Sequence, residues 1–162
     1  MLNCHKIEQA LLKGYLDGLL ELCVNTRGVP FARVYGRANF DTESRESSLA
    51  RVRLLIKRLC GVYPYLAVED EISLGALAYD FAISSQGIAS AFIGDGGLYG
   101  GEGESLECVA SMFIPVRVTE NDNNTLSIQE NNDGAFVGKE YDPVSYTLAL
   151  DNEISFIVNN AT

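Results

Sequence analysis

The chain has 162 residues, of which 47% are hydrophobic and 21% charged, so it can bury a core without metal or disulfide support. Its net charge of −10 argues against a general nucleic-acid binder, whose affinity comes from neutralised phosphates. The charge is unevenly distributed: residues 1–58 contain ten basic and six acidic residues (net +4), whereas residues 59–162 contain two and sixteen (net −14). Such a division favours association in which unlike ends of two molecules meet.

The cysteines and the first residues indicate in which cellular compartment the protein resides. Cys4, Cys23, Cys60 and Cys108 are too widely spaced for a CxxC motif or a zinc site. The first residues lead into an amphipathic segment and not into the apolar core of a signal peptide. We therefore expect free thiols in a reducing compartment, either the cytoplasm of a host cell or a virion.

Residues 4–24 are predicted to form a helix. Apolar residues recur there every three or four positions, Asn3 is a candidate N-cap, and Asn25 begins the segment that ends the helix. Gly14 and Gly18 lie inside it. Each disfavours a helix by about 1 kcal/mol relative to Ala. Their spacing would let another backbone approach closely, although simple tolerance of glycine explains them as well.

A short strand is expected at 31–36, and a second helix at 43–60, capped by Asp41 or Thr42. The basic side chains of this helix form either a solvated face that complements the helix dipole or a basic ridge for an acidic partner. They are Arg45, Arg51, Arg53, Lys57 and Arg58.

From Tyr63 onward the pattern is that of strands and turns. A strand is predicted at 65–68, and the alternation of large and small residues favours another at 74–83, although abundant alanine leaves a helix open there. Small residues, serines and an aspartate interrupt 72–93, so we reject a transmembrane span. The glycine-rich stretch 94–104 is predicted to be a loop. It lacks the spacing and the cation of a phosphate-binding motif.

The last third is predicted to continue as strands separated by tight turns. The predicted strands are 108–119, 125–129, 144–150 and 153–158, and the turns are 121–124, 131–134 and 151–152. The chain is thus predicted to be a single α+β domain, 1–162. Two N-terminal helices (about 1–61) pack in it on a mainly antiparallel sheet from the C-terminal two-thirds (about 62–162).

Residues suited to catalysis or metal binding do not form a recognisable motif. His5 is the only histidine, and no nucleophile elbow is present. The calcium-loop pattern is also absent. We expect no cofactor and no metal. A pair of carboxylates brought together by the fold stays open as an enzymatic alternative.

Three short pieces of sequence resemble the tail-terminator and neck proteins of long-tailed bacteriophages. They are Arg33–Gly36, Pro64–Val68 and Phe113–Val116. The resemblance covers less than a tenth of the chain, and the helix at 43–60 stands where that family usually has a short loop. It implies a homo-oligomeric ring at the head–tail junction, without catalysis.

These observations together predict a non-enzymatic structural subunit of a homo-oligomeric assembly. Other structural proteins are expected as further partners, and we expect the protein to bind neither nucleic acid nor a membrane. The predicted contact joins the basic helix 43–60 to acidic strands or to the 94–107 loop of a neighbour. Its residues are Arg45, Arg51, Arg53, Lys57, Arg58, Asp95, Glu102, Glu104 and Glu107. The alternative is an acidic inhibitor that presents carboxylates to a basic, nucleic-acid-binding groove, which requires the acids of 69–71, 95–107 and 120–133 to form one surface.

Overall fold

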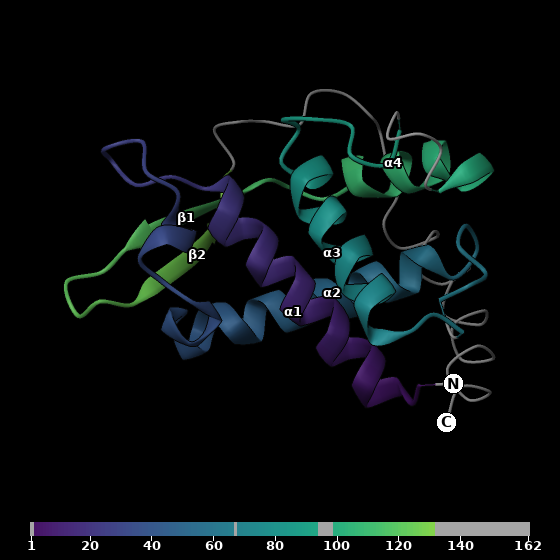
Figure 1. The fold of residues 1–162 in the computed structure, drawn as a ribbon, viewed down its shortest axis with the longest axis horizontal. Coiled ribbons are helices and arrows are strands. Elements are labelled where there is room, and N and C mark those ends of the chain that lie inside the picture. Colours follow the sequence, from purple (N-terminus) through teal and green to yellow (C-terminus); the bar gives the residue numbers. More distant parts are fainter. Residues whose placement is uncertain (1, 67, 94–98, 132–162) are drawn as a thin grey trace.

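The structure, a computed structural model, describes residues 2–66, 68–93 and 99–131. This part of the chain is α+β, with four α-helices followed by a two-stranded antiparallel sheet (Figure 1). The elements are α1 (Cys4–Leu22), α2 (Thr42–Leu59), α3 (Glu71–Ser85), α4 (Gly103–Ser111), β1 (Val116–Glu120) and β2 (Leu126–Glu130). Short 3₁₀ turns occupy Phe31–Arg33, Arg37–Asn39 and Gly100–Glu102.

The two helices predicted in the first 60 residues are confirmed, together with their caps. The Asn3 side chain accepts a hydrogen bond from the backbone N–H of Lys6 at 2.9 Å, and Asp41 accepts one from Ser44 at 2.8 Å. These bonds satisfy N–H groups that the first turn of a helix leaves without a partner. Local periodicity and capping therefore fix α1 and α2.

The strand favoured at 74–83 is wrong, because this segment lies in helix α3. Asp70 caps it by accepting from the Ser73 N–H at 2.7 Å. Its buried positions follow a helical period, with alanines packed beside larger residues: they are Leu74, Leu77, Ala78, Phe81, Ala82, Ser84 and Ser85. Within the described residues, no helix is both long enough and apolar enough to cross a bilayer.

Three other strand predictions need correction. In 31–36, residues Phe31–Arg33 form a 3₁₀ turn, and in 65–68 the amides of Val68 and Glu69 bond to the Tyr65 carbonyl as in a turn, so the described residues of neither segment form a strand. The segment 108–119 is divided between the end of α4 and β1. The α4 helix itself begins inside the predicted loop, because Leu106, Val109 and Ala110 bury one helical face.

The hairpin at 116–130 agrees with the predicted turn at 121–124 and strand at 125–129. Val118 is paired with Ile128 in its register, and Asn124 adopts the left-handed conformation at φ 60° in the turn. The predicted turn at 131–134 extends beyond the described residues, and the predicted elements at 144–150, 151–152 and 153–158 lie wholly outside them.

Side chains cover both edges of this small sheet. The Gln86 side chain makes two hydrogen bonds to the backbone of Val116, with Nε2 donating to the carbonyl at 2.7 Å and Oε1 accepting from the N–H at 2.8 Å. On the other edge, the Ser44 hydroxyl accepts from the Ile128 N–H at 2.7 Å. An edge whose polar groups are already bonded is a poor template for another strand.

The core lies around the crossing of α1 and α3 and extends to α2 and the sheet (Figure 1). Tyr15, Phe81 and Phe113 form a continuous series of aromatic contacts through it, with ring centroids 5.7 Å and 4.8 Å apart. This series joins α1, α3 and the segment after α4, so it positions the surfaces described next.

Candidate functional site

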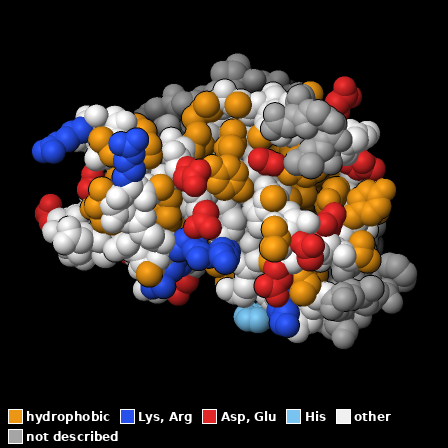
Figure 2. Space-filling model, in the orientation of Figure 1, with side chains coloured by type: hydrophobic (Ala, Val, Ile, Leu, Met, Phe, Trp, Pro, Cys, Tyr) orange, Lys and Arg blue, Asp and Glu red, His pale blue; other side chains and the backbone are white. Residues whose placement is uncertain are grey.

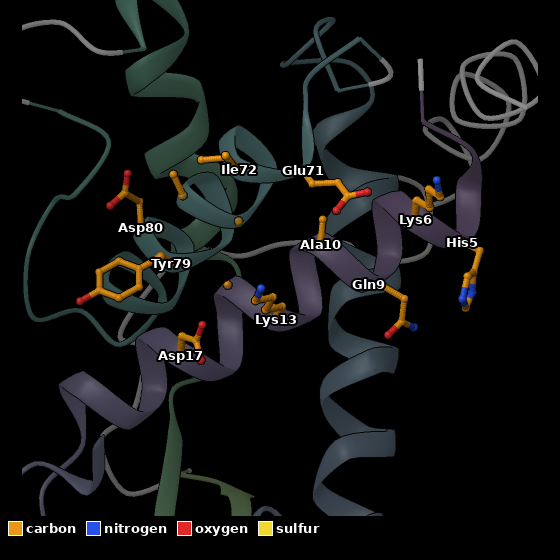
Figure 3. Close-up of a pocket in the computed structure, with 13 residues that line it drawn as sticks. His5, Lys6, Gln9, Ala10, Lys13, Asp17, Glu71, Ile72, Tyr79 and Asp80 are labelled. Carbon is orange, nitrogen blue, oxygen red and sulfur yellow. The ribbon is translucent and has the colours of Figure 1, made fainter. Parts of the chain in front are cut away.

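The described surface contains several hollows, and the first is a groove between α1 and α3. The helices approach closely because glycines face each other at their crossing: a Cβ on Gly14 would overlap the backbone of Gly75, and one on Gly18 would lie 2.7 Å from the Cβ of Ala82. Close approach, and not mere tolerance, therefore explains the two glycines of α1. Small side chains leave a groove of about 730 Å³ along the crossing (Figure 3).

The rims of this groove differ in charge. Lys6 and Lys13 project from α1, which also carries Asp17 farther along the groove, whereas Glu71 and Asp80 stand on α3 (Figure 3). Ile72 lies on the α3 rim and is 85% exposed, the highest value among the large hydrophobic residues described as exposed. The groove thus combines an unburied apolar side chain with charges of both signs.

Phenolic hydroxyls donate hydrogen bonds to two carboxylates at and near the groove. Tyr79 donates a hydrogen bond to Glu21, and Tyr99 donates one to Asp80. The bond to Glu21, together with burial, raises the pKa of Tyr79 to about 12. Tyr79 is consequently a neutral donor at physiological pH and not a general base.

The second hollow, of about 540 Å³, lies between α2, the segment 112–115 and the sheet. Its polar lining comes mainly from α2: Ser47, Ser48, Arg51 and Arg58 all face it. Its apolar lining consists of Ala50, Leu54, Met112, Phe113, Ile114, Val116 and Ile128, and Tyr15 and Glu130 complete it. We call it the arginine cavity.

The two arginines of this cavity are held by the segment that follows α4. Arg51 Nη2 donates to the Ile114 carbonyl at 2.7 Å, and Arg58 Nη1 donates to the Met112 carbonyl at 3.4 Å. Both guanidinium groups also lie over the Phe113 ring, at 5.4 Å and 4.6 Å from its centroid. Arg58 is only 4% exposed, so part of the predicted basic ridge faces the interior.

The remaining basic residues of the predicted interface are arranged differently. Arg45 is exposed on the first turns of α2. Arg53 is also exposed and forms an ion pair with Glu8, with Nε and Oε1 3.1 Å apart. Lys57 is half-buried and interacts within the molecule.

The acidic residues of the predicted interface are likewise divided. Asp95 lies outside the described residues. Glu104 is exposed, Glu102 is half-buried, and Glu107 accepts a hydrogen bond from Ser84 Oγ at 2.5 Å. Although α2 and α4 are in contact, no ion pair found between described residues joins a base of α2 to these acids.

The uneven charge of the sequence is therefore retained on the surface. The two ion pairs between described residues, Arg53–Glu8 and Arg37–Asp17, both lie within the first 58 positions. Figure 2 shows basic side chains gathered toward the hairpin side of one face, and acidic ones prevailing on the opposite side. The two halves of the chain do not neutralise each other through these pairs.

Catalytic and metal-binding groups are sparse in this geometry. His5 is exposed and lines the α1–α3 groove. The described residues contain no cluster of three or more side chains suited to hold a metal ion. Ser48, which the sequence analysis did not single out, is buried beside the arginine cavity, and its hydroxyl has no hydrogen-bond partner among the described residues. No sequence pattern distinguishes it from the neighbouring serines.

Comparison of the chain with protein-family models, curated proteins and solved structures gave no match.

Proposed function

We propose that the protein is a non-enzymatic structural subunit of a homo-oligomeric assembly, and that the α1–α3 groove is its contact surface. The observation that carries this proposal is Ile72, an aliphatic side chain 85% exposed on the rim of an open groove of about 730 Å³. A large apolar side chain beside a groove is typical of a surface that another protein covers.

The charges of the two rims make a second copy the natural occupant. When two copies meet groove to groove about a twofold axis that runs along the groove, their helices are parallel and the α1 rim of each faces the α3 rim of the other. Lys13 of one copy then approaches Glu71 of its partner, and each contact occurs twice. Complementary charge of this kind fixes orientation more than it adds affinity.

The finer form of the proposal, a ring at the head–tail junction of a long-tailed phage, depends on the sequence resemblance alone. In two of the three pieces that carry the resemblance, 33–36 and 64–68, the described residues form no strand, although the resemblance implies one. The third reaches a strand at Val116. A self-associating subunit is accordingly the broader and better supported proposal.

The alternative of an acidic inhibitor receives less support from the placement of the acids. The β1–β2 turn lies at one end of the long axis, whereas the connection before α3 lies toward the other (Figure 1). The acids of 69–71 and those of 120–130 are thus separated. A phosphate mimic needs them on one continuous surface.

The experiment is size-exclusion chromatography with light scattering on the full chain and on two matched variants. Ile72→Glu places a charge in the proposed interface. Val34→Glu places the same charge at another exposed β-branched residue, 69% exposed and outside the groove. We expect the unmodified protein and Val34→Glu to form dimers or larger species, and Ile72→Glu to be monomeric.

Ionic strength provides a second readout, because the rim charges are exposed and screened by salt. Raising the salt concentration should weaken the association of the unmodified protein. A monomer at every concentration in low salt, or equal dissociation of both variants, would refute the proposal.

A further inference from the structure

The arginine cavity has a built polar wall whose position does not depend on a ligand. Arg51 and Arg58 are seven residues apart and therefore lie on the same face of α2. Backbone carbonyls at 112 and 114 and the Phe113 ring hold both side chains in place. Side chains fixed in this way bind a ligand without first losing conformational freedom.

In this wall, Arg51 has hydrogen-bond donors that the described contacts do not use. A guanidinium group carries five N–H donors, and the described hydrogen bond from Arg51 to the Ile114 carbonyl uses one of them. Its side chain is half-buried and lines the cavity. An oxyanion is the ligand group that this fork of donors fits best.

Ser48 gives an independent indication of a polar ligand. Ser48 is 2% exposed and is among the residues that line the same cavity, and its buried Oγ has no hydrogen-bond partner among the described residues. A buried hydroxyl without a partner is costly, and such groups in native proteins call for an explanation. A ligand oxygen that reaches both Ser48 and Arg51 would provide the missing bond.

The rest of the lining defines the class of ligand. Leu54, Ile114, Val116 and Ile128 form apolar walls, so the ligand must carry a hydrocarbon portion as well as its anionic group. Glu130 lies on the same lining and opposes a second negative charge. A singly charged carboxylate is therefore favoured over a phosphate.

We propose that the cavity between α2, the segment 112–115 and the sheet binds a small amphipathic monocarboxylate, with its carboxylate on Arg51 and Ser48 and its hydrocarbon portion on the apolar wall. The volume of about 540 Å³ lies in the range of small-molecule sites. This site is separate from the α1–α3 groove and does not depend on self-association.

Titration calorimetry on the full chain tests the proposal with three probes. Octanoate has both features, 1-octanol has the hydrocarbon portion without the charge, and inorganic phosphate has charge without the hydrocarbon portion. We expect octanoate to bind with a Kd below about 1 mM, and each of the other two to bind at least about tenfold more weakly. Absence of octanoate binding, or equal binding of octanol or phosphate, would overturn the proposal.

Matched variants locate the site. Arg51→Gln removes the charge and the guanidinium donors but keeps a polar side chain of similar stem, and Arg45→Gln makes the same change on the exposed start of α2. The affinity for octanoate should fall at least about tenfold in the first variant and stay unchanged in the second. Equal affinity in both variants would place the ligand elsewhere and refute the assignment.

Ser48→Ala completes the test without disturbing the contacts of Arg51. Loss of one hydrogen bond should weaken octanoate binding about fivefold. The unliganded variant should nevertheless be at least as stable as the unmodified protein, because a buried hydroxyl without a partner is removed. Unchanged octanoate affinity in Ser48→Ala would contradict the role of Ser48.

Discussion

Gly14 of α1 and Gly75 of α3 face each other where the two helices cross, and the space between them is too small for a methyl group. The neighbouring crossing of Gly18 over Ala82 is nearly as close. Two helices that meet through such small residues bring their backbones together, and the rows of larger side chains on either side then form the walls of a groove. The groove proposed as the contact surface is thus a direct consequence of glycine in α1.

Gly14→Ala is expected to destabilise the protein by about 3 kcal/mol, because the added methyl group would overlap the carbonyl oxygen of Gly75. Helix propensity alone predicts the opposite sign, a gain of about 1 kcal/mol. Urea unfolding measures the difference. Gly36→Ala is the control, since a Cβ there meets no atom within 4 Å, and it should change stability by less than about 0.5 kcal/mol. A stabilised Gly14→Ala would contradict the close packing.

Sequence periodicity was sufficient for α1 and α2 but not for α3. The large residues Leu77, Phe81 and Ile83 stand at spacings that include an alternation typical of a strand, and the helical pattern appears only when Ala78 and Ala82 are counted as core residues. Alanine belongs to the core here because α1 presents glycine opposite it. That pairing is a tertiary property, so a local pattern could not establish it.

The candidate sites were visible from the sequence only in part. Arg51 and Arg58 could be placed on one face of a helix, but the carbonyls and the aromatic ring that receive them lie more than 50 residues later. The same holds for the groove, in which Gly14 was evident and Gly75 was not. Sequence identified one half of each contact, and the fold supplied the other.

Glu107→Ala is expected to loosen the connection between α3 and α4. Glu107 Oε1 accepts hydrogen bonds from Ser84 Oγ at 2.5 Å and from the Phe92 N–H at 3.0 Å. Removing the carboxylate leaves both donors without this partner and should cost about 2 kcal/mol. Hydrogen exchange of the Phe92 amide should accelerate accordingly. Glu104→Ala, one turn earlier on an exposed position, should leave that amide unchanged; equal acceleration in both variants would contradict the role assigned to Glu107.

Asp41 is expected to make stability depend on acid pH. Hydrogen bonds from Ser127 Oγ (2.5 Å) and the Ser44 backbone (2.8 Å) hold the pKa of Asp41 below its ordinary value. The resulting stabilisation is present above the unfolded pKa of about 3.9 and is lost as pH falls through the lower, folded pKa.

Asp41→Asn tests this expectation, because asparagine also caps helices but does not titrate. Between about pH 5 and about pH 2, the unmodified protein should lose more of its free energy of unfolding than Asp41→Asn does. Asp122→Asn changes an exposed acid of the β1–β2 turn and should retain the full acid dependence. Identical pH profiles for all three proteins would show that the bonds to Asp41 do not contribute.

Gln86→Glu is expected to destabilise the sheet edge in a way that acid relieves. Gln86 Nε2 donates to the Val116 carbonyl, and Val116 is only 5% exposed, so an ionised glutamate would set one oxygen against another away from water. The cost at neutral pH should be about 2 kcal/mol or more. Protonation turns the side chain back into a donor, so the difference in free energy of unfolding from the unmodified protein should narrow toward about pH 4.

Gln129→Glu, an exposed change on β2, lacks this mechanism and serves as the control in urea unfolding at both pH values. A Gln86→Glu deficit that stays constant with pH would mean that the amide does not pair with Val116, and that the edge of β1 is protected by other means.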